Sequence, residues 1–270
     1  MIRRPLLLLM MLAVAVPATA AGPDPPDPGA NDPRDPFGAV ASLRLASPTV
    51  VKTKAILWLT AQGVKDEKLA AAKAAWKEVE PSALLDRLAG TLAIGDRHVA
   101  ELVGFCTNAG PDAKLPDVAW LSKKDLDPFV RDNLRLYFGR WLARNKYYDE
   151  ALAQFADLDA ATVVDPASLL FFQSVCYHSL VQPDPGLKAI GRLLEDVDEA
   201  PTRYVRVAAL MLQDLKGVKG ESLDFASRLM RDAERRLRLA RAGKRVRKVE
   251  DDVVSILDKL IKEMEEAGGG

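Results

Sequence analysis

The sequence has few of the residues that usually build reactive or structural centres. Its 270 residues include two cysteines and two histidines, which are too few for a metal cluster or a disulfide framework. Basic and acidic residues are equal at 38 each, so no net charge would attract nucleic acid. Strand-like alternation of polar and apolar residues is also missing. What remains, 49% hydrophobic and 28% charged residues, is the composition of a globular helical chain.

Catalytic motifs are missing as well. His98 and His178 lie far apart, and neither has an acidic residue or a cysteine at the spacing of metal ligands. The chain has no Gly-rich phosphate loop and no Ser-His-Asp order. We therefore expect no enzymatic activity, no cofactor and no metal site, and an envelope hydrolase is the least favoured function. Cys106 and Cys176 fall on apolar helix faces, where either two buried thiols or one disulfide would fit.

The N-terminus has the three-part order of a secretory signal in residues 1–20. Arg3 and Arg4 precede an apolar run over residues 6–16, and the small residues Ala18 and Ala20 predict cleavage after Ala20. An uncleaved membrane anchor is the alternative, although the run is short for a bilayer. We therefore expect an exported protein, periplasmic or extracellular, that contacts a membrane only if this segment is retained.

Residues 21–36 have the composition of a tether. They hold six prolines and four aspartates, which favour extended polyproline-like conformations and cannot form a core. The alternative is a disordered N-terminus with no role of its own.

Residues 37–110 carry repeated helix start and stop signals. The starts are Ser47-Pro48, Asp66, Pro81 and Asp96, and the stops are Gly63, Gly95 and Gly110. Connections this short make neighbouring helices antiparallel, so we expect packed helical pairs. Residues 111–127, which contain two prolines, are predicted to form an elbow before the next helices.

Residues 128–215 repeat a helical hairpin, most clearly over residues 134–158. In that unit Gly139 is a small residue in the first helix, and Ala151 and Phe155 are an alanine and a large apolar residue in the second. The small position recurs at Ser174 and Ala209, at steps of 35 residues. Pro166 and Pro201 start the following units.

This pattern resembles the tetratricopeptide repeat, which has a period of about 34 residues. The resemblance implies an all-α solenoid of αα-hairpins whose concave surface binds an extended peptide or a partner protein. HEAT-like pairs are an equal alternative for the N-terminal helices. Carrying the ligand-facing positions of the family onto the first helix of each unit gives Asn133, Leu136, Arg140, Arg144, Phe171, Val175, His178, Arg203, Arg206, Leu210 and Gln213.

Residues 221–267 predict a C-terminal helical hairpin, and they resemble the ends of exported bacterial helical-repeat proteins. The hairpin would either cap the solenoid or serve self-association. Its basic stretch, residues 231–248, is interpreted as a solvated helix face, because acidic residues partly neutralise it and no aromatic residues interleave. The favoured function is therefore an exported, non-catalytic scaffold for a protein or peptide partner. A self-associating structural subunit is the alternative.

Overall fold

Helices make up most of the described part of the chain. A computed structural model describes residues 42–110, 113–123 and 125–268. The expected signal peptide (residues 1–20) and tether (residues 21–36) lie outside these residues. Within the described ranges there are eleven α-helices and no strand, and one isolated bridge joins Leu43 to Val197. In the same ranges, no helix is long and apolar enough to span a membrane.

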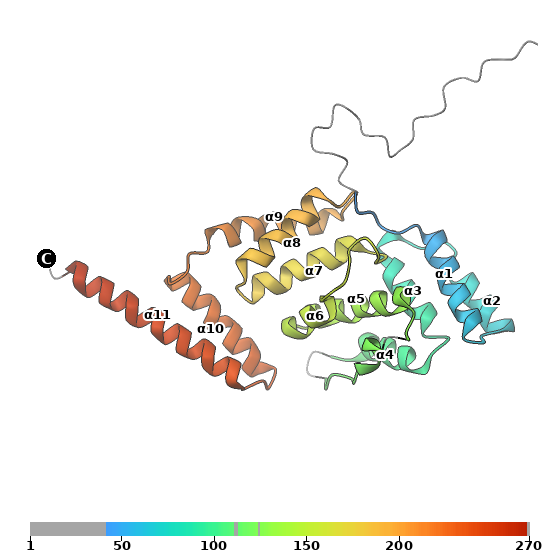
Figure 1. Cartoon of the computed structure of the whole chain (residues 1–270), viewed down its shortest axis with the longest axis horizontal. Coiled ribbons are helices and arrows are strands. Elements are labelled where there is room, and N and C mark those ends of the chain that lie inside the picture. The colour runs from blue at the N-terminus through green and yellow to red at the C-terminus, as the bar shows by residue number, and fades with distance from the viewer. Residues whose placement is uncertain (1–41, 111–112, 124, 269–270) are drawn as a thin grey trace, which may run out of the picture. The chain divides into compact units, whose positions relative to one another are not determined.

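The helices follow one another with short connections (Figure 1). Their bounds are α1 Pro48–Ala61, α2 Asp66–Ala74, α3 Leu84–Leu92, α4 Arg97–Asn108, α5 Pro128–Arg144, α6 Tyr148–Phe155, α7 Pro166–Ser179, α8 Pro183–Glu195, α9 Thr202–Gly217, α10 Leu223–Arg238 and α11 Lys244–Gly268. Two short 3-10 helices, Pro81–Ala83 and Ala119–Ser122, precede α3 and α5.

Local sequence chemistry sets several of these helix starts. The carboxylates of Asp96, Asp127 and Asp165 each accept a hydrogen bond from the backbone N–H three residues later, at 2.9–3.1 Å. These bonds satisfy an amide that the helix itself leaves unpaired. Proline follows at the first position of α5 and α7, where it needs no donor. These helices therefore begin where the caps in the sequence place them.

Successive helices pack against one another as hairpins. The closest pairs are α5 with α6 and α7 with α8, and α8 then packs on α9. Gly139 and Phe155 set the approach of α5 to α6. A β-carbon added at Gly139 would lie 2.9 Å from Cδ1 of Phe155, well inside van der Waals contact. The predicted pairing of a small residue with a large apolar one is thus present in this hairpin.

The small position of the third unit differs from the prediction. Ser174 is buried as expected, but Ala209 is exposed and Ala208 is fully buried in its place. The buried face of α9 also contains Tyr204, Met211 and Leu215. Ala208 continues that helical spacing, whereas Ala209 is turned about 100° away from it. The second step of the repeat is therefore 34 residues.

A single hydrophobic core runs through α1 to α9. It continues past the expected elbow, where Leu121 and Val130 join it. The buried apolar residues of α10 and α11 do not belong to this core. The C-terminal hairpin therefore has a small apolar seam of its own.

An extended strap precedes α1 and reaches the connection between α8 and α9. The amide of Leu43 donates to the carbonyl of Asp196 at 2.6 Å, and its carbonyl accepts from the amide of Asp198 at 2.9 Å. Arg44 adds an ion pair with Asp198 at 2.8 Å. Ala46 donates to the carbonyl of Val164 at 3.0 Å. The strap thus connects the N-terminal helices to the third hairpin.

Candidate functional site

The candidate site is a cleft of about 420 Å³. The strap, the start of α3, the end of α5, the start of α7 and the start of α9 line it. Three of the residues predicted to face a ligand, Arg140, Arg144 and Arg203, line this cleft together. The fold therefore brings basic side chains from α5 and α9 to one place.

Arg140 is the most buried of the three arginines. Its guanidinium forms an ion pair with the carboxylate of Asp86 in α3 and lies 5.5 Å from the centre of the Tyr137 ring. Burial of an arginine requires such a partner, because an unpaired charge away from water is costly. Arg140 therefore links α5 to α3, and its charge is already paired with that of Asp86.

Arg144 and Arg203 are exposed and stack on aromatic rings. Arg144, one turn after Arg140, lies 5.7 Å from the ring centre of Phe172, and Arg203 lies 5.0 Å from that of Tyr204. Within the described ranges, no carboxylate forms an ion pair with either one. The rings hold the two guanidinium groups by cation–π contact and leave their N–H donors available.

Most acidic residues of the cleft already bind another group of the chain. Asp86 pairs with Arg140, Asp198 pairs with Arg44, and Asp165 accepts from the amide of Ser168 at 2.9 Å as the cap of α7. Glu199 is exposed at the edge of the cleft, and no described residue forms an ion pair with it. Among the described residues, the cleft therefore offers two cations and one carboxylate without an ion-pair partner.

Burial and neighbouring positive charges both act on Arg144. Partial burial and then the positive charges of Arg140 and Arg203 lower the pKa of Arg144 from its ordinary value. An arginine stays protonated at physiological pH even so. Burial is the largest cause of this shift, and the charges of Arg140 and Arg203 add a repulsion that an anion between these side chains would relieve.

Comparison with protein-family models, curated proteins and solved structures finds no match to this chain.

Asn133, also predicted to face a ligand, is a buried structural residue. Its side-chain oxygen accepts from the amide of Val164 at 2.8 Å, and its amide nitrogen donates to the carbonyl of Phe129 at 2.8 Å. The bond with Val164 joins α5 to the loop before α7, and the bond with Phe129 lies within α5. Asn133 is therefore out of reach of a ligand in the cleft.

The remaining predicted residues lie outside the cleft lining. Phe171 is half-buried and stacks on Tyr204, with ring centres 4.0 Å apart. His178 lies at the far end of α7, where its Nε2 is 2.7 Å from the carboxylate of Asp214. Arg206 and Gln213 are exposed on α9. Phe171 thus packs against Tyr204, which lines the cleft. His178 belongs to a contact outside the cleft.

That second contact joins the C-terminal hairpin to the repeats through arginine–carboxylate pairs. Asp149 of α6 pairs with Arg236 at 2.7 Å, Arg245 at 2.8 Å and Arg235 at 3.5 Å. Glu150 pairs with Arg241, and Asp214 accepts from Arg228 at 2.5 and 2.8 Å. The interpretation of the basic stretch as a solvated face is wrong for Arg235 and Arg236, because their side chains are buried against Asp149 of the repeats.

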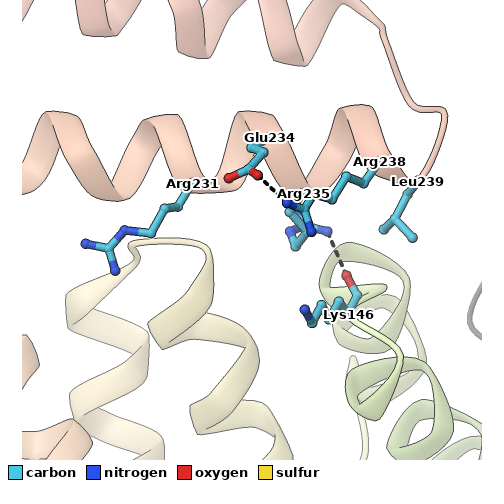
Figure 2. A pocket seen from close by; sticks show the side chains of 6 residues that line it. All are labelled: Lys146, Arg231, Glu234, Arg235, Arg238 and Leu239. Atoms are coloured by element: carbon cyan, nitrogen blue, oxygen red, sulfur yellow. Dashed lines mark hydrogen bonds and ion pairs between the residues drawn. The ribbon is translucent and has the colours of Figure 1, made fainter.

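Figure 2 shows the edge of this junction, a small pocket of about 180 Å³. Arg235 points from α10 to the end of α5 and donates to the carbonyl of Lys146 at 2.7 Å. Arg238 pairs with Glu234 at 2.6 Å on the same helix. Of the charged side chains that line this pocket, Arg235 holds the hairpin to the repeats, and Arg238 and Glu234 are paired with each other.

The two cysteines are free thiols. Cys176 is fully buried and Cys106 is partly buried. Burial raises the pKa of both thiols to about 12. A thiol with that pKa is protonated at neutral pH and is a poor nucleophile.

Proposed function

We propose that this chain is an exported, non-catalytic scaffold of tetratricopeptide-like hairpins that binds an acidic, extended segment of a partner protein. Arg144 and Arg203 carry the proposal, since they reach one cleft from two helices and no carboxylate of the described chain neutralises them. Two such guanidinium groups suit a carboxylate, which accepts paired hydrogen bonds from arginine.

The size and lining of the cleft support a peptide ligand. Its volume of about 420 Å³ lies within the range of about 300–1,000 Å³ that is usual for ligand pockets. Tyr204 supplies an apolar wall beside Arg203. Solenoids of helical hairpins commonly bind extended chains on their inner surface. We expect one Asp or Glu side chain of the partner to lie between Arg144 and Arg203.

A charge-reversal experiment tests this proposal. The probe is an array of peptides from envelope proteins in which each Asp and Glu is replaced in turn by Asn or Gln. The double variant Arg144→Glu with Arg203→Glu is expected to lose binding to the acidic peptides by about a hundredfold. Arg206→Glu, also exposed on α9 but outside the cleft, is the matched control and should bind as the wild type does. Equal binding by the double variant would refute the proposal.

The proposed export rests on residues 1–20. Arg3 and Arg4, the apolar run and the small residues before Ala21 support secretion and cleavage. The N-terminal sequence of protein recovered from the envelope fraction should begin at Ala21. A chain that retains Met1 in that fraction would favour the anchored alternative.

A further inference from the structure

Three arginines follow one another along the side of α10 that faces the repeats. Arg228 binds the carboxylate of Asp214 in α9 at 2.5 and 2.8 Å. Arg235 pairs with Asp149 of α6 at 3.5 Å. Arg231 lies between these two, and spacings of three and four residues keep all three on one side of the helix. No described carboxylate forms an ion pair with Arg231, so the middle of the row lacks the acidic partner that its neighbours have.

A second cation without an ion pair, Lys146, is held close to Arg231. The carbonyl oxygen of Lys146 accepts a hydrogen bond from Arg235 at 2.7 Å, and Arg235 stands one helical turn after Arg231. In Figure 2, Arg231 extends from α10 toward the turn between α7 and α8, and Lys146 stands on the turn between α5 and α6. No described carboxylate pairs with Lys146, and the guanidinium of Arg231 has one long hydrogen bond, to the hydroxyl of Ser227 at 3.4 Å. The bond from Arg235 therefore fixes the two cations near each other.

The two cations line a pocket between the repeats and α10. Lys146, Arg231 and Arg235 are in the walls of both the pocket of about 180 Å³ and a larger one of about 310 Å³. We call the larger pocket the groove. Tyr148 and Ser179 also line it, and their hydroxyl groups form no hydrogen bond with another described residue. The groove therefore has two unpaired cations and two hydroxyl groups in its lining.

The acidic side chains of the two pockets are already bound. Asp232 lines the groove, where it is buried and accepts from Arg236 at 2.7 Å and from Arg235 at 3.0 Å. Glu234 lines the smaller pocket and pairs with Arg238 at 2.6 Å. The lining of the groove contains four Lys or Arg side chains and one Asp. Because that Asp and two of the four cations are paired, the charge left over is positive and favours an anion.

We propose that the groove binds a phosphate group between Lys146 and Arg231. Arginine holds phosphate through two parallel hydrogen bonds and lysine holds it as a point charge, so this pair of side chains suits it. A phosphate group has more acceptor oxygens than a carboxylate, and the hydroxyl groups of Tyr148 and Ser179 can donate to them. The bound group would give Arg231 the anionic partner that the other two arginines of the row find in the repeats.

A bound phosphate would also strengthen the attachment of the C-terminal hairpin. Lys146 belongs to the repeats and Arg231 to the hairpin, so an anion between them connects the two. A ligand that binds only the attached hairpin stabilises that state in proportion to the logarithm of its concentration. Saturating phosphate should therefore slow hydrogen exchange in α10 by at least about threefold. Soluble phosphoesters and lipid headgroups carry the same chemical group, and separate probes distinguish them.

Phosphorus NMR on the full chain tests the proposal, with inorganic phosphate from about 0.1 to 10 mM at constant ionic strength. Lys146→Gly and Arg231→Gln should each raise the dissociation constant about tenfold or more, because each removes a charged donor. Lys146 has a φ of 66°, which glycine adopts without strain, so that variant should keep the turn. Lys248→Gln is the matched control and should bind as the wild type does, since Lys248 is exposed on the same hairpin but outside both pockets.

A variant of the cleft separates the two sites. Arg144→Gln with Arg203→Gln should keep the phosphate affinity within about twofold, because neither residue lines the groove. Loss of binding in that variant, with binding kept in Lys146→Gly and Arg231→Gln, would place the phosphate in the cleft and overturn the proposal. A wild-type chain that binds no phosphate up to about 10 mM would overturn it as well.

Two further probes identify the source of the phosphate group. Glycerol phosphate is the soluble probe, and vesicles of phosphatidylglycerol, compared with vesicles of phosphatidylcholine, are the lipid probe. Binding of glycerol phosphate that weakens in Arg231→Gln assigns the groove to a soluble phosphoester. Binding of phosphatidylglycerol vesicles alone, lost in Arg231→Gln, assigns it to a lipid headgroup. If Arg231→Gln changes the binding of neither probe, the proposal is wrong.

Discussion

The ring of Phe155 lies directly on the backbone of Gly139, where any side chain on α5 would hold α6 away. A β-carbon there would meet Cδ1 of the ring at 2.9 Å and Cζ at 3.0 Å. The ring is itself buried, so it has little room to move. The spacing of the α5–α6 hairpin therefore depends on the absence of one methyl group.

We expect Gly139→Ala to lower the free energy of unfolding by about 1–3 kcal/mol, because overpacking outweighs the better helix propensity of alanine. Urea unfolding followed by circular dichroism measures it. Gly191→Ala in α8 is the matched control, since nothing lies within 4 Å of a β-carbon there. That change should stabilise the protein by about 0.5–1 kcal/mol. Stabilisation by both substitutions would contradict the close packing at Gly139.

Asp149 is expected to hold the C-terminal hairpin against the repeats. Asp149→Asn removes the charge that Arg235, Arg236 and Arg245 share, and leaves Asp232 of α10 as the carboxylate partner of the buried Arg235 and Arg236. Hydrogen exchange should accelerate in α10 and α11 while α5 and α7 keep their protection. Asp224→Asn, which removes an exposed pair with Arg228 within α10, is the control and should change little.

The same contact predicts a pH dependence. Burial opposes the charged form of Asp149, but the hydrogen bond from Arg236 and the charges of Arg236, Arg245 and Arg235 outweigh it and lower the pKa. A carboxyl with a depressed pKa in the folded state adds stability above its unfolded pKa of about 3.9, and loses it as pH falls further. Hairpin protection should thus be constant from about pH 5 to 8 and decline below about pH 4. In Asp149→Asn this decline should be much smaller.

Cys106 and Cys176 are expected to behave as two unreactive thiols. In the folded protein at pH 8, alkylation by iodoacetamide should be slow, because burial raises both pKa values to about 12. Unfolding without a reductant should then allow two labels per chain, counted by mass spectrometry. An unfolded chain that takes up no label until it is reduced would show a disulfide.

Local features of the fold could be read from the sequence. Asp127-Pro128 and Asp165-Pro166 start helices because a cap acts on amides only three residues away. The register of α9 could not be fixed in this way, since Ala208 and Ala209 are both small. Burial of the whole face from Tyr204 to Leu215 decides between them.

The candidate site could not be predicted in this way, because it is formed by contacts between residues that lie far apart in the sequence. The pairing of Arg140 with Asp86 spans 54 residues, and no local pattern in the sequence points to it. Asp149 is similarly separated from the arginines that it binds, which is why the basic stretch reads as a solvated face. Tyr204 could have been predicted from the sequence as a residue of the site, because it directly follows Arg203 at the start of a helix.

The strap has a consequence for the order in which the chain folds. Helical repeats can assemble one after another as they emerge, because each unit contacts only its neighbours. Leu43, however, completes its hydrogen bonds only with Asp196 and Asp198. Residues 43–46 must therefore wait for some 150 later residues, and closing a loop of that length is slow. During synthesis this segment would stay open to proteases until the third hairpin had folded.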